Sequence, residues 1–292
     1  MRFTDIGQQL RAYRLESGLR AEEIAARLGV SRAALYRYEK GEVIKLDTVN
    51  RLAELLKISP LSLLGIGVEY YNRPVGFFER LRQIEETADQ ILQVALPLVY
   101  LISSDELDAV ERDLFAEIAG EGGTERAAQR AGAEQVLGIL AERKRMYRMR
   151  RPSIIAMFSA HAVARMLQQG VGQGNGRAEM LRHRARAVAR TEVENVATLM
   201  EAEPMGLQFG LLAGGEPSGQ FQILRSRDRA TLAINPFRSD TLPHQPCGVA
   251  MITGAEEAVA AHQRVAESMW RDAIKGPAGA ARMRELLAAN PL

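Results

Sequence analysis

Few residues of this sequence are suited to covalent cross-links or to metal binding. Its 292 residues include one cysteine, Cys247, and four histidines. A single thiol excludes an internal disulfide framework and any zinc or iron–sulfur site that needs several cysteines. The histidines form no HExxH pattern, so we expect no metal site. An unpaired thiol is typical of a reducing compartment, and we expect a cytoplasmic protein.

Long hydrophobic runs are absent as well. The longest, residues 91–102, is interrupted by Gln93 and Pro97. A helix that spans a bilayer needs about 20 apolar residues, so the sequence predicts no transmembrane segment and no membrane partner. Asp5 and Gln8 stand where the apolar core of a signal peptide would lie, and so we do not expect export.

Charge of one sign is not in excess either. The 38 basic and 36 acidic residues leave a net charge of +2, although 33 of the basic residues are arginine. Hydrophobic residues make up 47% of the chain and charged residues 25%, which is typical of a folded globular protein. At roughly 100–200 residues per domain, the length predicts more than one domain and fewer than three.

Residues 1–64 have the pattern of a small all-α domain with five closely spaced helices. Apolar residues recur at helical spacing, and Gly18 and Gly29 stand where helices should end. Ser31 is suited to cap the third helix, and Pro60 to begin the fifth.

Glycine and proline punctuate residues 65–76 and predict a linker. Its adjacent tyrosines, Tyr70 and Tyr71, favour packing against one of the domains over a free tether. Residues 77–292 combine helical and strand-like periodicity, and we expect them to form a domain for dimerisation and effector binding. The expected helices are 77–95, 104–119, 126–149, 153–169, 177–201, 255–275 and 278–289. The expected strands are a buried run at 98–102 and four segments at 205–213, 220–226, 230–236 and 247–253.

The predicted fold class of the whole chain is α+β. It combines the all-α N-terminal domain with a C-terminal helical domain that holds a small, mainly antiparallel sheet.

A set of spaced residues in the N-terminal domain resembles the helix-turn-helix domain of the lambda-repressor/Cro type, also called the XRE family. The resemblance covers about a fifth of the chain and implies a DNA-binding domain. The residues that carry it are Leu10, Arg14, Gly18, Glu23, Ile24, Ala25, Leu28, Gly29, Val30, Ser31, Leu35, Tyr38, Glu39, Lys40, Gly41, Leu52, Ala53 and Leu56.

The resemblance implies that the helix after Ser31 is the recognition helix, which lies in the major groove while the preceding helix crosses the DNA backbone. Arginine can pair bidentately with guanine O6 and N7, and alanine can contact a thymine methyl. The expected base contacts are Ser31, Arg32, Ala33 and Arg37. The expected phosphate contacts, which position the protein without reading sequence, are Arg11, Arg20, Lys40 and Lys45. In the family, the positions of Arg14 and Glu39 form an ion pair that ties the first helix to the recognition helix.

The second helix departs from the family pattern at its start. The family usually has Ser or Thr as the N-cap and Gln as the first helical residue, where this chain has Arg20 and Ala21. The chain therefore lacks a side-chain cap worth about 1 kcal/mol, and Ala21 cannot hold a phosphate as Gln does.

Two features of residues 77–292 leave alternatives open. Clustered arginines are typical either of solvated helix faces or of an anion-binding surface, for which the candidates are Arg145, Arg148, Arg151, Arg182 and Arg186. Polar residues interrupt the apolar strands at Gln208, Gln222 and Asn235, which fits a small-molecule pocket or a sheet with one wet face.

The C-terminal part contains no GxGxxG or GxxxxGK[ST] pattern and no recognisable nucleophile motif, so we expect no cofactor and no enzymatic activity. The sequence favours a homodimeric, sequence-specific transcriptional regulator whose partners are double-stranded DNA, a second copy of itself and a small-molecule effector. The alternative is a DNA-targeted enzyme, or an antitoxin-like module whose C-terminal half binds a protein partner.

Overall fold

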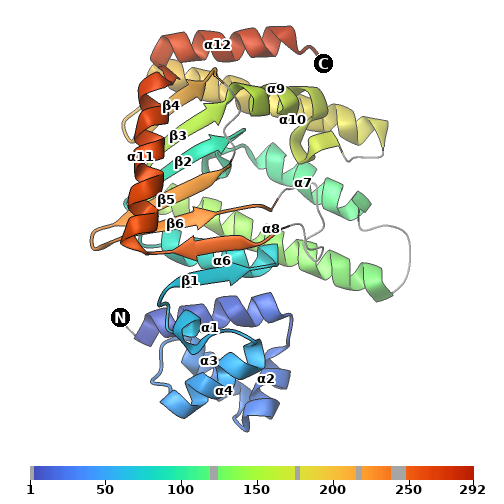
Figure 1. Ribbon diagram of the computed structural model, residues 1–292. Helices are drawn as coiled ribbons and strands as arrows, with labels where there is room; N and C mark the ends of the chain where they lie inside the picture. Colours follow the sequence, from blue (N-terminus) through green and yellow to red (C-terminus); the bar gives the residue numbers. More distant parts are fainter. Residues whose placement is uncertain (1–2, 119–123, 175–177, 215–218, 238–247) are drawn as a thin grey trace.

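The computed structural model describes the chain except for residues 1–2, 119–123, 175–177, 215–218 and 238–247, which include Cys247. A small helical domain lies at one end of a larger domain that is built around one sheet (Figure 1). In the described residues, no helix is long and apolar enough to cross a membrane.

Residues 3–63 are all described and form the five helices expected of the N-terminal domain. These are α1 (Phe3–Ser17), α2 (Ala21–Leu28), α3 (Arg32–Glu39), α4 (Leu46–Leu56) and α5 (Pro60–Leu63). Gly18 and Gly29 end the first two with φ of 71° and 70°, in the left-handed region that glycine adopts without strain. The hydroxyl of Ser31 accepts a hydrogen bond from the Ala34 N–H at 3.1 Å and so caps α3.

The described strands form one eight-stranded mixed sheet, in the order β1-β7-β6-β5-β2-β3-β4-β8. Their bounds are β1 (Val68–Tyr71), β2 (Gln90–Leu96), β3 (Ser153–Ser159), β4 (Leu207–Leu212), β5 (Phe221–Ser226), β6 (Arg229–Ile234), β7 (Ala250–Thr253) and β8 (Ile274–Lys275). Strands β2, β3 and β4 run parallel to one another, whereas the remaining pairings are antiparallel. The prediction of a small, mainly antiparallel sheet was therefore wrong in both size and strand direction.

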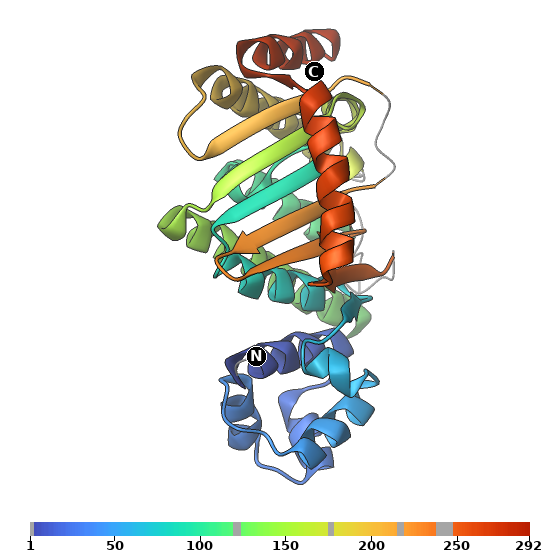
Figure 2. The ribbon, with the colours of Figure 1, turned by 60° about the vertical axis from the view of Figure 1, so that its left-hand side comes forward.

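The helices cover the two faces of this sheet unequally. Figure 2 shows α11 crossing one face, with other helices of the C-terminal domain behind the sheet. Leu92 and Ile223 pack toward α11, whereas their neighbours Ile91 and Leu224 belong to the core on the opposite face. The helices are α6 (Pro74–Glu85), α7 (Asp105–Ile118), α8 (Thr124–Arg150), α9 (Ala160–Gln169), α10 (Glu179–Ala202), α11 (Glu256–Asp272) and α12 (Gly276–Ala289).

The four strands expected between residues 205 and 253 are confirmed as β4–β7, but β2 and β3 lie in segments predicted as helices. Both strands are buried on two faces, so they read as apolar runs without alternation, and such runs are also typical of buried helices. The strand predicted at 98–102 was wrong, because Tyr100–Ile102 is a turn of 3₁₀ helix. It follows the short turn after β2, in the connection that leads to α7.

The segment predicted as a linker lies against the larger domain. Val68–Tyr71 forms strand β1 and pairs antiparallel with β7, and α6 begins at Pro74. Tyr71 is fully buried and its ring stacks on that of Tyr13 in α1, with 5.3 Å between ring centroids. The chain therefore passes from the helical domain into the sheet within a few residues.

Candidate nucleic-acid interface

A continuous apolar core holds α3, the helix expected to contact bases, in place. Leu10, Ile24, Leu35 and Leu52 come from four different helices and are fully buried. Helix α1 approaches the end of α3 so closely that a Cβ atom added at Gly7 would lie 2.5 Å from the Tyr38 carbonyl oxygen. The orientation of α3 is therefore coupled to that of α1 by packing.

An ion pair ties the same two helices together. The Arg14 guanidinium donates to both Glu39 carboxylate oxygens, from Nε at 2.5 Å and from Nη2 at 3.1 Å. The side chains are only 14% and 5% exposed. Burial lowers the pKa of Arg14, but Glu39, with smaller contributions from Tyr36 and Glu79, raises it, and the net shift is upward, so Arg14 keeps its charge. This is the pairing that the family resemblance implied.

The outer surface of α3 carries the residues expected to contact bases. Ser31, Arg32, Ala33 and Arg37 are all exposed. Residues at the beginning of such a helix are the ones that reach base edges in the major groove. Their exposure therefore leaves this surface free to meet DNA.

Both exposed arginines have intramolecular partners that the sequence did not reveal. Arg32 pairs with Glu22 of α2 at 2.7 Å, and its guanidinium lies 5.3 Å from the centroid of the Tyr36 ring. Arg37 pairs with Glu42 at 2.6 Å. Exposed ion pairs of this kind are weak, because water and salt screen them, so both guanidinium groups can exchange their carboxylate partners at little cost.

The expected phosphate contacts divide into two groups. Arg20, Lys40 and Lys45 are exposed near the ends of α2, α3 and α4. Arg11 instead pairs with Glu79 of α6 at 2.9 Å, so it lies at the junction with the larger domain. Because its guanidinium is directed to α6, Arg11 is not among the proposed DNA contacts.

The unusual start of α2 has a compensating contact. The backbone N–H of Arg20 donates to the Glu23 carboxylate at 2.9 Å, which is one half of a capping box. Glu23 therefore supports this helix end from inside the helix, where the family usually relies on a Ser or Thr cap.

Buried polar contacts join the helix-turn-helix region to the larger domain. Glu69 of β1 accepts hydrogen bonds from Arg80 Nε at 2.9 Å, Gln9 Nε2 at 2.6 Å and the Tyr71 hydroxyl at 2.7 Å. All four side chains are more than nine-tenths buried. Burial raises the pKa of Tyr71 and the Glu69 carboxylate raises it further, so this hydroxyl remains a donor.

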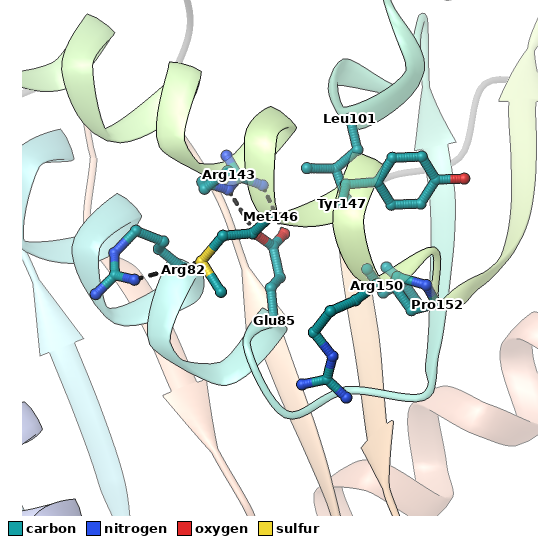
Figure 3. Close-up of a pocket in the computed structure, with 9 residues that line it drawn as sticks. Arg82, Glu85, Leu101, Arg143, Met146, Tyr147, Arg150 and Pro152 are labelled. Carbon is teal, nitrogen blue, oxygen red and sulfur yellow. Dashed lines mark hydrogen bonds and ion pairs between the residues drawn. The ribbon is translucent and has the colours of Figure 1, made fainter.

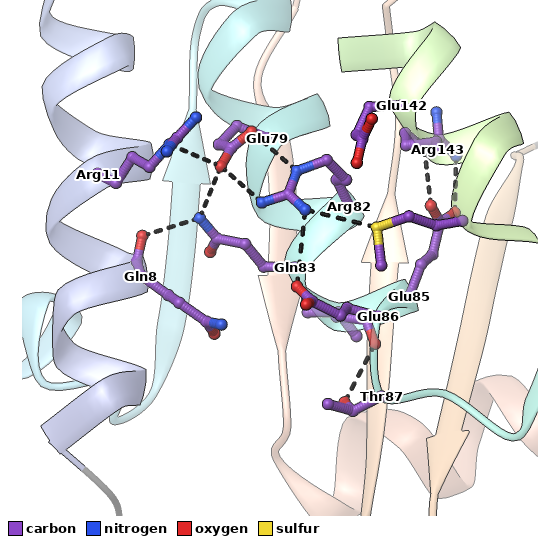
Figure 4. A network of polar contacts seen from close by, with 12 residues as sticks. Gln8, Arg11, Glu79, Arg82, Gln83, Glu85, Glu86, Thr87, Glu142 and Arg143 are labelled. Atoms are coloured by element: carbon purple, nitrogen blue, oxygen red, sulfur yellow. Dashed lines mark hydrogen bonds and ion pairs between the residues drawn. The ribbon is translucent and has the colours of Figure 1, made fainter. Parts of the chain in front are cut away.

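A second set of polar contacts joins α1 to α6 (Figure 4). Glu79 of α6 is almost fully buried and accepts hydrogen bonds from Arg82 at 3.0 Å and Gln83 at 3.1 Å, in addition to its ion pair with Arg11. Gln83 also donates to the Gln8 carbonyl in α1 at 3.1 Å. These directional contacts fix one orientation of α1 on α6.

The clustered arginines of the larger domain are largely paired within the chain. Arg145 pairs with Glu142 in the same helix, and Arg148 pairs with Asp105 of α7. Arg186 donates to the Pro291 carbonyl, and Arg182 is exposed on α10. Arg151 is exposed just after α8. These five residues thus lie in or just after α8 and in α10, and the structure gives no shared site for an anion among them.

Arg143, from the same basic cluster, has a structural role. Its guanidinium donates to the Glu85 carboxylate at 2.7 and 2.8 Å and joins α8 to α6 (Figure 3). The pocket beside this pair has a volume of about 10 Å³, enough for a single water molecule. This part of the cluster therefore stabilises helix packing.

The three polar strand residues considered for a pocket do not converge. Gln222 is buried on the face opposite α11, whereas Gln208 is exposed. The Asn235 side chain accepts a hydrogen bond from the Phe237 N–H and so supports a local turn. In the described residues, no group of three or more His, Cys, Asp or Glu side chains could hold a metal ion.

Glu111 of α7 is a buried acid, and its titration should make stability pH-dependent. Burial raises its pKa to about 7, and the nearby Asp108 carboxylate adds to this. Below about pH 4.5 both native and unfolded states hold the proton. Between about pH 4.5 and 7 only the native state keeps it, so stability falls as pH rises and levels off above 7.

In Glu111→Gln, the free energy of unfolding should no longer fall by the roughly 3 kcal/mol that the titration of Glu111 costs the wild type between low and high pH. Urea unfolding of the wild type and the variant at pH 5 and pH 8 measures the difference. Glu106→Gln, at an exposed position of the same helix, is the matched control and should leave the pH dependence unchanged. Parallel pH profiles for wild type and Glu111→Gln would contradict the assignment.

Comparison with known proteins agrees with this geometry. Residues 5–63 match the protein family described as a helix-turn-helix domain. Over 114 aligned residues, the chain is 42% identical to a protein of Pyrococcus horikoshii that is provisionally named an HTH-type transcriptional regulatory protein. The match covers 36% of this chain and 36% of that protein, so the chain spans little more than a third of the length of this curated relative. The aligned stretch is longer than residues 5–63, so the similarity includes residues outside this range. The N-terminal part of the protein, residues 5–63, is a helix-turn-helix domain.

Proposed function

We propose that the protein is a sequence-specific DNA-binding transcriptional regulator. The observation that carries the proposal is the exposed surface of α3, with Arg32 and Arg37 directed to solvent from a helix that Arg14 and Glu39 hold in place. On DNA, the two arginines exchange their carboxylate partners for guanine O6 and N7. Ser31 and Ala33 complete the base contacts. The name of the Pyrococcus horikoshii relative supports the same function.

The proposed regulator binds as a homodimer. A single helix-turn-helix domain reads one half-site, and specific operators of this class contain two half-sites about 34–36 Å apart. Residues 77–292 are proposed to supply the dimer contacts and an effector site. An effector acts only if it binds the DNA-competent and DNA-incompetent arrangements with different affinity.

Helix α1 is the proposed connection between effector and DNA. On one side it contacts the buried polar residues of β1 and α6 through Gln9, and on another it holds α3 through Arg14. A shift of β1 or α6 therefore moves α1, and α3 moves with it. The contacts between α1 and α6 support this route, because their buried partners leave little freedom for sliding.

Footprinting on the DNA upstream of the protein's own gene, at several salt concentrations, tests the proposal. The expected result is a protected inverted repeat with half-sites about one helical turn apart. Arg32→Ala or Arg37→Ala should weaken binding to this site by about 1–3 kcal/mol each and relax the base preference at one position. The charge-matched control is Arg112→Ala, at an exposed residue of α7, which should leave the footprint unchanged.

Random DNA provides the contrasting measurement. If either arginine reads a base, its loss should weaken binding to random DNA far less than binding to the operator. Equal losses on both DNAs would show that the arginine contacts only phosphates. Diffuse, salt-sensitive protection without a repeat would contradict specific binding to this DNA.

A further inference from the structure

The face of the sheet that α11 crosses has an open groove beside the helix. The groove has a volume of about 590 Å³ and lies between α11 and strands β2 and β3. The strand residues that form its floor are Gln90, Leu92, Ile155 and Met157. Leu92 and Ile155 are directly opposite each other in the strand register, so the floor is apolar apart from Gln90.

Trp270 forms a rigid wall of this groove. A Cβ atom added at Gly210 of β4 would lie 3.1 Å from Trp270 Cζ3, so the indole packs closely against the β4 backbone at a position without a side chain. The Lys275 ammonium lies 5.0 Å from the centroid of the indole ring and donates to the Trp270 carbonyl at 2.5 Å. These contacts hold the ring in one place.

The rim of the groove carries a net positive charge, because Arg264 and Arg271 outnumber Glu267 there. Arg264 and Arg271 line it from α11, seven residues apart on one side of the helix, and both are exposed. In the part of the chain that the structure describes, neither guanidinium has a hydrogen bond or an ion pair. The rim carboxylate, Glu267, already accepts a hydrogen bond from Gln263 at 2.8 Å, and Gln263 in turn accepts one from Arg225. Among the described residues that line the rim, two positive charges therefore face one negative charge, since the hydrogen bond from the neutral Gln263 leaves the charge of Glu267 in place.

We propose that this groove binds a small monocarboxylate with an apolar body. The apolar part would lie on the Leu92–Ile155 floor against Trp270, and the carboxylate would pair with Arg264 or Arg271. The volume is within the range of about 300–1,000 Å³ that is typical of small-molecule sites, and an apolar floor with a few polar groups at the rim is their usual composition. The charge at the rim selects an anion over a cation with the same body.

This inference deepens the proposed function, on which it rests, because it gives the effector a site and a chemical class. The site is formed by β2, β3 and α11, all outside the helix-turn-helix domain. Ligand binding is measured without DNA, so failure of the site and failure of DNA recognition are separate results.

The test uses the full-length protein and two probes with the same phenyl-alkyl body, 4-phenylbutyrate and 4-phenylbutylamine. Trp270 is the one tryptophan in the sequence, so intrinsic fluorescence reports on the groove. The expected result is a saturable fluorescence change with 4-phenylbutyrate and at least about fivefold weaker binding of 4-phenylbutylamine, equivalent to about 1 kcal/mol. Calorimetry on the same samples gives the dissociation constants independently.

Paired variants separate this groove from the rest of the surface. Arg264→Ala/Arg271→Ala should weaken 4-phenylbutyrate binding at least about fivefold and abolish the preference over the amine. The charge-matched control, Arg112→Ala/Arg229→Ala, removes two exposed arginines elsewhere and should bind as the wild type does. The cavity on the other side of Trp270 is lined by neither Arg264 nor Arg271, so binding there would survive the first variant.

Three results would overturn the proposal. The first is equal binding of the two probes to the wild-type protein. The second is 4-phenylbutyrate binding that Arg264→Ala/Arg271→Ala does not change. The third is no saturable signal up to about 10 mM, a concentration that detects as little as about 3 kcal/mol of binding free energy.

Discussion

Replacing Arg80 with methionine should lower the free energy of unfolding by about 3–5 kcal/mol, the largest effect expected in this protein. The guanidinium neutralises Glu69 in an environment where both side chains are less than 10% exposed. Without it, the Glu69 carboxylate keeps hydrogen bonds from Gln9 and Tyr71 but has no counter-ion. An uncompensated buried charge costs far more than the loss of the attraction itself.

Urea unfolding of full-length protein, followed by circular dichroism, measures this effect. The double variant Arg80→Met/Glu69→Met should recover part of the loss, because it leaves no buried charge, although the Gln9 amide and the Tyr71 hydroxyl lose their acceptor. Arg284→Met is the exposed control. It breaks ion pairs with Glu194 and Glu201 at the surface and should leave the free energy of unfolding nearly unchanged, because exposed ion pairs are screened by water and salt. Similar decreases in the free energy of unfolding for Arg80→Met and Arg284→Met would show that the buried ion pair contributes no more to stability than an exposed one.

Replacing Glu39 with alanine should destabilise the helix-turn-helix domain by about 3 kcal/mol, because it strands a largely buried Arg14 guanidinium. DNA binding should weaken as well, since α3 loses its polar link to α1. Thermal unfolding of full-length protein and operator binding are the two measurements.

Glu42→Ala is the matched control for this variant. Glu42 also pairs with an arginine at the end of the recognition helix, but both partners are about half exposed. Its loss should change stability by no more than about 1 kcal/mol and should not weaken operator binding, because it releases Arg37 for DNA. If Glu39→Ala unfolds at the wild-type temperature, the Arg14–Glu39 pair does not stabilise the domain.

The Arg80 and Glu39 variants both act on helix α1, one through the larger domain and the other through α3. Arg80 acts on α1 through Glu69 and Gln9, and Glu39 acts on it through Arg14. A variant at either site therefore tests whether the orientation of α1 is transmitted to α3. If α1 transmits the change in its orientation to α3, Arg80→Met should bind the operator more weakly than Arg80→Met/Glu69→Met does. The comparison is made at a temperature where both variants are folded.

The N-terminal domain could be predicted from sequence because its determinants are local. Glycines in the left-handed region end its helices, Ser31 caps α3, and apolar residues recur at helical spacing. The spacing of these residues also identified the exposed positions of α3, since each helix has one buried face. The partners Glu22 and Glu42 were missed because one comes from another helix and both are exposed charges without a distinguishing pattern.

The parallel centre of the sheet could not be predicted in the same way. Strands β2 and β3 are neighbours in the sheet, but a long connection through α7 and α8 separates them in the chain. Burial on both faces also removes the alternation of apolar and polar residues that identifies a strand. Only tertiary pairing distinguishes such runs from buried helix. The segment 65–76 was predicted to be a linker for the same reason. Its residues Val68–Tyr71 form the edge strand β1 only because β7 pairs with them.

By itself, the sequence determined the helix-turn-helix domain and the residues that it presents to solvent, because short-range spacing and capping specify both. Tertiary structure alone decided the eight-stranded order of the described sheet, the buried Glu69–Arg80 junction and the groove beside α11. Each of these brings together residues more than ten positions apart in the chain. Long-range pairing is selected by the summed burial and charge compensation of the whole fold, and no local window of sequence contains that sum.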